Sequence, residues 1–346
     1  MRSVIPTKGS ADRRRMDPLS HVILGRTLIA LDRRGRFGPG AAAASALGAI
    51  APDIDAIAIW RGWDVYLRVH EIGTHSIPGS FAVASAAATL IYSLKRECRY
   101  GTLMLAAWIG ALSHVVFDLV SGATIKVGWP VFQGRARLPL VAMADPWVIA
   151  ICLAGAGAFW ICRHRMARIA VAVVTAIVVF LALKGTLMAI ALPQWAAATS
   201  ADTILHRTVE ASWSSLTRWD VFDRTPRALR RWRVDALADR ATLLTSYPVQ
   251  SDPPIVESSK SLDTVRNFLH THQLGFAVVT TADNGDTRVL WSDIRYCSDD
   301  GDIIASGDGP PVACAVWFGG TFNREGHAVT QIVRVGRWLR IRPAGP

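Results

Sequence analysis

The sequence predicts a mainly α-helical fold: a polytopic helical membrane domain followed by a smaller extracytoplasmic domain with antiparallel β structure. Three observations support this prediction. The 346-residue chain is 51% hydrophobic and only 19% charged, whereas a soluble domain carries about 25% charged residues. Its long apolar runs all lie before residue 195. Short segments rich in Val, Ile, Thr and aromatic residues follow after about residue 270.

The same composition excludes several classes of protein. An intrinsically disordered chain, a collagen and a small disulfide-rich protein would each contain far fewer large apolar residues. The formal net charge is +11. Such a charge suits nucleic acid, but it equally suits cytoplasmic loops and anionic lipid, so the positions of the charges must decide.

Residues 1–15 are interpreted as a basic N-terminal extension. They are polar and end in three arginines, and Met16 follows as a natural start. No cleavable signal peptide is expected, because no apolar stretch precedes a small-residue cleavage site. Asp17 before Pro18 is a helix-opening signal. The short apolar run 19–31 that follows is expected to form an interfacial or re-entrant helix.

The helical membrane domain is expected to cover residues 16–194. A membrane span needs about 20 residues, and four apolar runs approach or exceed this length: 76–94, 102–121, 146–162 and 167–192. A fifth run, 41–60, contains Pro52, which disfavours helix at Ala51. We therefore expect five spans, of which the first is broken, and one shorter amino-terminal helix.

Basic clusters between these runs predict the orientation. They comprise Arg33-Arg34-Gly35-Arg36, Lys95-Arg96-Glu97-Cys98-Arg99, and Arg163-His164-Arg165 with Arg168. All three fall on one side if run 41–60 spans, and by the positive-inside rule that side is cytoplasmic. The prediction is a multi-pass protein of the bacterial inner (cytoplasmic) membrane. Its amino terminus is cytoplasmic, and loops 61–75 and 122–145 and everything after residue 192 face outward.

Residues 195–346 are expected to form an extracytoplasmic, membrane-proximal and β-rich domain. The span 195–240 is predicted to be helix or loop near the membrane surface. Its arginine run around Trp232 is expected to meet lipid phosphate, and nucleic acid is not expected outside the cell. Strands are predicted at 275–281, 287–297, 312–318 and 328–335.

A disulfide is predicted between Cys297 and Cys314. These two cysteines alone lie in the domain placed outside, where disulfides persist. Both occur in strand-like segments joined by a glycine-rich connection that allows a hairpin. Two buried, unpaired thiols are the alternative.

Polar residues within and beside the apolar runs are the strongest functional signal. His114 and Asp118 are four apart and share one helix face. Ionisable groups inside a span are costly and usually face a bundle interior or a wet cavity. Asp53 and Asp55 flank an isoleucine in the broken run, where an unwound backbone would aim both at one cation. The alternatives are an interhelical hydrogen-bonded pair and an aspartate-capped helix end.

Two further histidines complete the candidate site. His70 and His75 are five apart with a glycine between them, which suits a turn before a helix capped by Thr74 or Ser76. Imidazole and carboxylate ligands together favour Zn, with Mn or Fe as alternatives. His21 is a further candidate metal ligand, or else a surface or capping histidine. Asp145 is expected to cap a helix.

The ordered set of motifs resembles the YdjM-like family of membrane-bound, metal-dependent hydrolases. The motifs are Asp-Pro-Leu-Ser-His21, Ala-Pro-Asp53-Ile-Asp55, His70-x4-His75-Ser76, Ser113-His114-x3-Asp118 and Gly128-Trp-Pro130. The resemblance covers about residues 16–165. It implies one or two divalent ions in a helical membrane domain, with ligands among His21, Asp53, His70, His75, His114 and Asp118. The family has Arg-Gly after the first histidine, where this chain has Glu71-Ile72.

The mechanism expected from this resemblance is metal-assisted hydrolysis. Water made acidic by the metal attacks an ester or phosphoester, and Asp55 or Glu71 accepts the proton. An outward-facing site would meet membrane lipid, so a lipid or lipid-linked substrate is expected. The alternative is a non-catalytic membrane protein with a structural metal site or an ion or proton path. The sequence predicts no oligomeric state.

Overall fold

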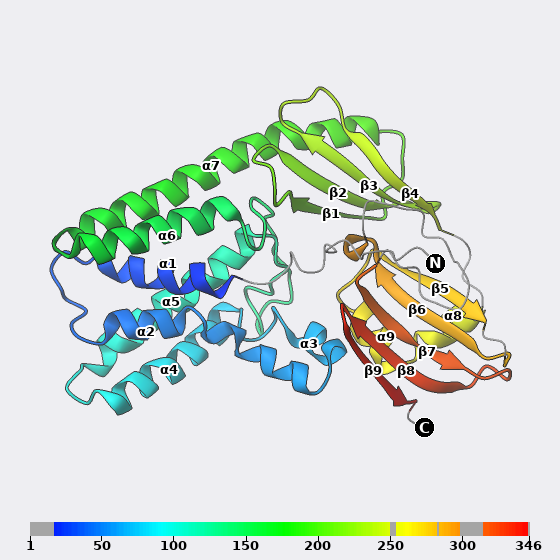
Figure 1. The fold of residues 1–346 in the computed structure, drawn as a ribbon, viewed down its shortest axis with the longest axis horizontal. Coiled ribbons are helices and arrows are strands. Elements are labelled where there is room, and N and C mark those ends of the chain that lie inside the picture. Colours follow the sequence, from blue (N-terminus) through cyan, green and yellow to red (C-terminus); the bar gives the residue numbers. More distant parts are fainter. Residues whose placement is uncertain (1–16, 250–253, 282–283, 298–313, 345–346) are drawn as a thin grey trace, which may run out of the picture.

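A computed structural model describes residues 17–249, 254–281, 284–297 and 314–344. The predicted fold class is confirmed: a helical amino-terminal region precedes a carboxy-terminal region with two antiparallel sheets (Figure 1). The helices of the first region are α1 (Pro18–Ala30), α2 (Ala41–Gly48), the 3-10 helix η2 (Ala51–Trp60), α3 (Trp63–Val69), α4 (Ile77–Leu94), α5 (Tyr100–Val120), α6 (Pro146–Ile161), the 3-10 helix η3 (Arg163–Arg165) and α7 (Met166–Ala198).

Three of these helices begin at a side-chain cap followed by proline. Asp17 accepts a hydrogen bond from the Ser20 amide at 3.2 Å, Ser76 from the Gly79 amide at 3.0 Å, and Asp145 from the Trp147 amide at 3.0 Å. Such caps satisfy amides that have no partner within the helix. Asp145 is thus a helix cap, as predicted.

The long apolar helices agree with the predicted spans. Within the described residues, α4, α5 and the segment Arg163–Ala198 are long and apolar enough to cross a membrane. Helices α2 and η2 pass the same test together, although they meet at a bend of 43°. This bend lies directly before Pro52, where a break was predicted. Helix α6 is apolar but shorter.

Glycines bring α2 and α5 into very close contact. A Cβ atom added at Gly48 would lie 2.0 Å from the Ala107 carbonyl oxygen, and one added at Gly110 would lie 2.0 Å from the Ser45 carbonyl oxygen. Small residues of this kind are what membrane helices use to approach one another closely. The contact fixes η2, which follows α2, against the carboxy-terminal half of α5.

The carboxy-terminal region contains two sheets. Its elements are β1 (His206–Ala211), β2 (Arg218–Arg224), β3 (Ala228–Asp235), β4 (Thr242–Pro248), α8 (Pro254–Ser259), α9 (Asp263–Leu269), β5 (Gly275–Thr281), β6 (Thr287–Asp293), the 3-10 helix η4 (Ile294–Tyr296), β7 (Val316–Phe322), β8 (Ala328–Val335) and β9 (Trp338–Pro343). Strands β1 to β4 form one sheet and β5 to β9 the other, each in sequence order. Helices α8 and α9 contact the second sheet.

The prediction of helix or loop over 195–240 is wrong for the three strands within that segment, and the rest of the segment is the end of α7 and loops. These strands are β1 to β3, and the end of α7 packs against their sheet through Trp195, Trp219 and Val234. Charged residues alternate with these apolar residues, as expected for a sheet with one face on a helix. The alternation lowers the mean hydropathy of the segment, and for this reason the strands were not predicted from the sequence. In the second sheet, β9 was not predicted. A strand was predicted at 312–318, and its first residues, 312–313, lie outside the described residues.

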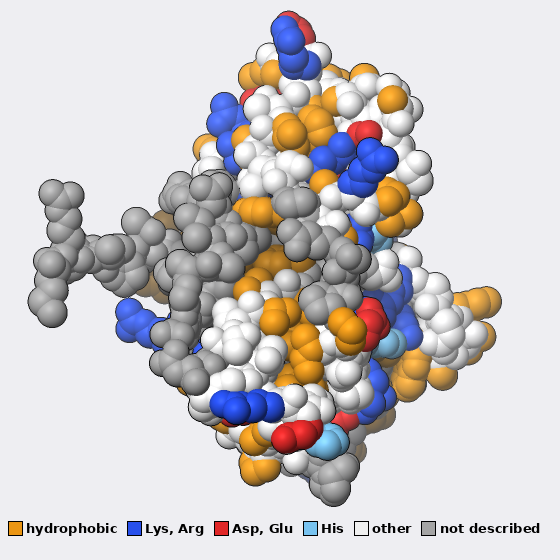
Figure 2. Space-filling model, turned by 90° about the vertical axis from the view of Figure 1, so that its right-hand side faces the viewer, with side chains coloured by type: hydrophobic (Ala, Val, Ile, Leu, Met, Phe, Trp, Pro, Cys, Tyr) orange, Lys and Arg blue, Asp and Glu red, His pale blue; other side chains and the backbone are white. Residues whose placement is uncertain are grey.

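The arginine run is largely neutralised within the chain. Arg230 pairs with Asp223 at 2.7 Å, and Arg233 pairs with Asp220 at 3.2 Å. Viewed from the side of the sheets, Lys and Arg side chains are interspersed with acidic and hydrophobic ones across the described surface (Figure 2). These guanidinium groups therefore have carboxylate partners without any lipid phosphate.

The predicted disulfide is confirmed, since Cys297 and Cys314 are bonded with their Cα atoms 3.9 Å apart. The other three cysteines are free thiols.

The helical bundle has two distinct ends. The basic loops after α1, α4 and α6 lie together at one end, and η2, α3 and both sheets lie at or beyond the other (Figure 1). Helix α1 runs opposite to α2, which places Asp17 at the end near the sheets. If the basic end is cytoplasmic, α1 begins on the opposite side. The predicted cytoplasmic terminus itself falls on residues outside those described.

Candidate metal centre

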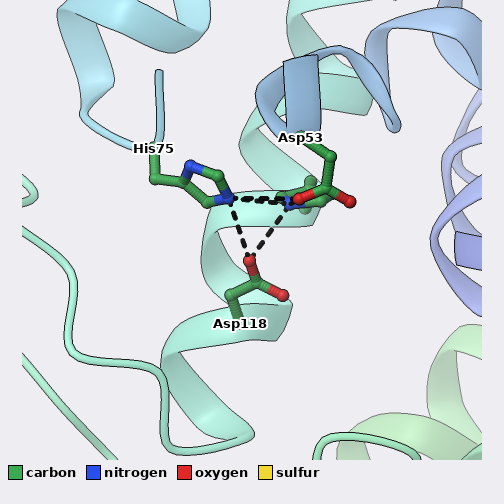
Figure 3. A group of neighbouring side chains, drawn as sticks. Asp53, His75 and Asp118 are labelled. Atoms are coloured by element: carbon green, nitrogen blue, oxygen red, sulfur yellow. Dashed lines mark hydrogen bonds and ion pairs between the residues drawn. The ribbon is translucent and has the colours of Figure 1, made fainter. Parts of the chain in front are cut away.

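Four predicted ligands converge from three separate segments (Figure 3). Asp53 lies in the first turn of η2, and His75 lies in the short loop directly before the cap of α4. His114 and Asp118 are one turn apart on α5. Each offers one atom: Asp53 Oδ1, His75 Nε2, His114 Nε2 and Asp118 Oδ2.

Five of the six distances among these four atoms are close to those of a tetrahedral ligand set. Each histidine Nε2 lies 3.4 Å from Asp53 Oδ1. Asp118 Oδ2 lies 3.4 Å from His75 Nε2 and 3.0 Å from His114 Nε2, and the two Nε2 atoms are 3.3 Å apart. Around an ion bound at about 2.0–2.1 Å, neighbouring tetrahedral ligands are about 3.3–3.4 Å apart. The residues present therefore fit a metal ion.

The burial of two carboxylate oxygens without hydrogen-bond partners also indicates a cation. Asp53 Oδ1 and Asp118 Oδ2 are buried, and neither receives a hydrogen bond of acceptable geometry from the described residues. Burying such an oxygen without a partner is costly. The two atoms that lack partners are the same two that face the histidine nitrogens. A bound cation would satisfy both.

Neighbouring groups orient both histidines. His114 Nδ1 donates to the Ala49 carbonyl oxygen at 2.7 Å, which leaves the Nε2 lone pair free to face the other ligands. His75 Nδ1 lies 3.4 Å from Asp55 Oδ2 and 3.1 Å from the Thr74 hydroxyl. A partner of this kind on the second ring nitrogen is typical of metal-binding histidines.

His21 lies beside the four atoms rather than among them. Its Nε2 is 3.3 Å from Asp118 Oδ1, the oxygen that points away from the other ligands. Its ring stacks on His114 with centroids 4.1 Å apart. The structure thus places His21 where it holds Asp118 and packs on His114.

Asp55, His70 and His75 form a second group that shares His75 with the first. His70 Nδ1 lies 2.9 and 3.0 Å from the two Asp55 oxygens. Its Nε2 is buried and has no hydrogen-bond partner among the described residues. The four-atom group contains neither Asp55 nor His70.

Glu71 lies at the edge of the site. Its Oε2 accepts a hydrogen bond from the Thr124 amide at 3.0 Å, and its Oε1 is 4.0 Å from His70 Nε2. Its backbone has a positive φ of 64°. Glu71 thereby connects the turn before α4 to the loop between α5 and α6.

The sequence did not predict every group that orients the candidate ligands. The Ala49 carbonyl oxygen aligns His114, but a backbone group leaves no signal in a sequence. Thr74 was noticed only as a possible helix cap. Its hydroxyl instead donates to Asp55 Oδ2 at 3.1 Å, and its position next to His75 was the available signal.

Comparison with known proteins identifies the family of the helical region. The family model described as YdjM inner membrane protein matches residues 16–191, which include every residue of the four-atom group. No curated protein and no solved structure shows significant similarity to the chain. The match covers half of the chain and all of the helical region except the last residues of α7. The chain therefore belongs to the YdjM inner membrane protein family.

Proposed function

We propose that this membrane protein is a metal-dependent hydrolase that cleaves an ester or phosphoester in a lipid or lipid-linked substrate. The observation that carries the proposal is the four-atom group. It brings two imidazole nitrogens and two buried, unsatisfied carboxylate oxygens within 4.8 Å of one another. This donor set suits Zn best, with Mn or Fe as alternatives.

Asp53, His75, His114 and Asp118 would hold the ion. When bound, it supplies Lewis acidity that polarises a substrate oxygen and makes water a stronger acid. The Ala49 carbonyl oxygen and Asp55 keep the histidine Nδ1 protons away from the ligand atoms. Of the two proposed proton acceptors, Asp55 lies nearer the four atoms, through His75, whereas Glu71 lies behind His70.

The position of the site supports a lipid substrate. The four atoms lie where η2 meets the ends of two apolar helices, α4 and α5. The side chain of Asp53 is 20% exposed, whereas those of His75 and His114 are fully buried, so the site opens at Asp53. On the same 3-10 helix, Ile54, which follows Asp53 directly, is 62% exposed, and Trp60 at the end of η2 is 83% exposed. An apolar surface beside the opening favours contact with lipid.

Metal analysis of the purified full-length protein tests the first part of the proposal. We expect a stoichiometric divalent ion in the wild type and its loss in His75→Ala and His114→Ala. His164→Ala is the matched control, because His164 lies exposed at the opposite end of the bundle. Metal absent from the wild type, or unchanged in both site variants, would contradict the metal centre.

A screen of esters and phosphoesters in detergent tests the second part. We expect turnover that disappears in the same two variants and persists in the control. Stoichiometric metal without turnover on any of these substrates would instead support a structural metal site or an ion path.

A further inference from the structure

Four basic residues from three segments gather beside the metal centre, and we call them the basic cluster. They are Arg68 of α3, Lys126 and Arg135 of the loop between α5 and α6, and His270, which ends α9. Neither the metal centre nor the proposed hydrolysis uses them.

Helix α9 joins two members of the cluster. Arg68 donates to the Asn267 side-chain oxygen at 3.3 Å. His270 follows Asn267 by three residues, so both lie on the same face of this helical segment. Burial lowers the pKa of His270, and the charges of Arg135, Lys126 and Arg68 lower it further. The charges of these three residues thus act on His270, and the contact of Arg68 with Asn267 joins α3 to the same helix.

Lys126 and Arg135 lie opposite each other. Ile125 and Ala136 form an antiparallel bridge, with amide-to-carbonyl distances of 3.0 and 2.8 Å. Lys126 and Arg135 are the next residues on the two segments. Like charges in this arrangement repel and destabilise the pairing.

No acidic side chain among the described residues pairs with the basic cluster. Arg68 and Lys126 contact only the neutral oxygens of Asn267 and Gln133. The nearby carboxylates are engaged elsewhere: Asp64 with Asn267 and Arg342, Asp263 with Arg266, and Glu71 with the Thr124 amide. The arginines of the first sheet, in contrast, pair with aspartates. An anion would relieve the repulsion within the cluster.

The cluster borders the metal centre through the turn after α3. The Lys126 amide donates to the Glu71 carbonyl oxygen at 3.3 Å. Glu71 Oε1 in turn lies 4.0 Å from His70 Nε2, and His70 contacts Asp55. Arg68 precedes His70 by two residues. The cluster is thus joined to the second histidine group through Glu71.

We propose that the basic cluster binds a phosphate group of the substrate, so that the enzyme acts on an anionic phosphoester rather than a neutral ester. This inference rests on the proposed hydrolase function. Arginine and lysine together suit phosphate, because they combine directed N–H donors with a compact charge.

Binding of inorganic phosphate to the full-length protein in neutral detergent, stripped of metal by a chelator, tests the cluster separately from catalysis. We expect saturable binding to the wild type and at least about tenfold weaker binding to R68Q/K126Q/R135Q. The matched control K95Q/R96Q/R99Q removes three charges at the opposite end of the bundle and should bind like the wild type. Should the triple variant fail to fold, R135Q alone, at an exposed position, should weaken binding about threefold.

Equal affinity in the wild type, the cluster variants and the control, or no saturable binding to the wild type, would overturn the inference. Either result leaves the metal centre standing if the wild type still carries its ion. Failure of the hydrolase screen with phosphate binding intact would overturn only the catalytic role.

Competition by short-chain phosphatidic acid would identify a lipid headgroup as the source of the phosphate. Phosphate binding without such competition would identify a soluble phosphoester.

Discussion

His75 faces two groups of side chains, one with each ring nitrogen. Its Nε2 lies among the four candidate ligand atoms, and its Nδ1 lies beside Asp55 and Thr74. A neutral imidazole carries one proton, so a proton on Nδ1 leaves Nε2 to bind metal. We therefore expect Asp55 to act on the candidate metal centre through His75, in addition to its predicted role as a proton acceptor.

Asp55→Asn is expected to weaken metal affinity about 10- to 100-fold, because an amide holds the Nδ1 proton less well than a carboxylate. The measurement is a competition titration of the purified variant against a chromogenic chelator. Asp239→Asn changes an exposed aspartate of the first sheet region and should leave metal affinity unchanged. An Asp55→Asn variant with wild-type affinity would exclude this role of Asp55.

Asp293 predicts a dependence of stability on pH. Burial raises the pKa of its carboxyl group, but the charge and hydrogen bonds of Arg295 outweigh burial and lower that pKa to about 2. In an unfolded chain an aspartate titrates at about 3.9. The native state is therefore favoured above pH about 4, and this contribution, about 2 kcal/mol, is lost as the pH falls from about 4 to about 2.

Denaturant unfolding of the carboxy-terminal region at several pH values measures this effect. Between pH 6 and pH 2 the wild type should lose about 2 kcal/mol more unfolding free energy than Asp293→Asn, which has no carboxyl group to protonate. Parallel losses in the two proteins would show that Asp293 does not titrate in this way.

At the scale of elements, the contact between α2 and α5 positions the candidate metal ligands. Gly48 and Gly110 let the two backbones approach, and Ala49, the next residue after α2, then meets His114. A side chain at Gly110 would force the helices apart. The Ala49 carbonyl oxygen would move away from His114 with them.

Gly110→Ala is therefore expected to destabilise the protein by about 1–3 kcal/mol and to weaken metal binding. Gly101→Ala is the matched control on the same helix, since a Cβ atom there meets nothing within 4 Å. Thermal unfolding in detergent and metal content together check the prediction. Equal melting temperatures and metal content in both variants would contradict it.

At the scale of the whole molecule, α7 connects the membrane region to the first sheet. From Met166 to Lys184 it rises about 27 Å, close to the thickness of the bilayer core, about 30 Å. Lys184 is buried, and its ammonium group donates to the Leu216 carbonyl oxygen at 3.0 Å and lies 4.2 Å from the Trp219 ring centroid. Beyond it, α7 packs on the sheet, so we expect the helix to leave the bilayer near Lys184.

The basic loops predict that both sheets lie outside the cytoplasm, and the disulfide between Cys297 and Cys314 agrees with an oxidising compartment. An alkaline phosphatase reporter fused to the carboxy terminus should be active, because it folds only outside the cytoplasm. The same reporter fused after Arg99, in a basic loop, should be inactive. Activity at Arg99 alone would reverse the predicted orientation.

The sequence by itself predicted the apolar helices, helix caps, the break before Pro52, the disulfide and a set of candidate metal ligands. Each of these depends on a local pattern: a run of apolar side chains, a capping residue before proline, or ionisable groups where apolar ones are expected. Ordered motifs then restricted the candidate ligands to a few residues.

Only the tertiary structure decided which of those candidate ligands belong to the four-atom group and which lie outside it. His75, His114, Asp53 and Asp118 come together because glycines set the distance between α2 and α5, whereas His21 and His70 lie just outside. The first sheet escaped prediction because its buried face depends on α7, which supplies the apolar partner for strands rich in charge. The basic cluster likewise joins residues distant in sequence. Contacts of this kind depend on packing between elements, which a local pattern does not encode.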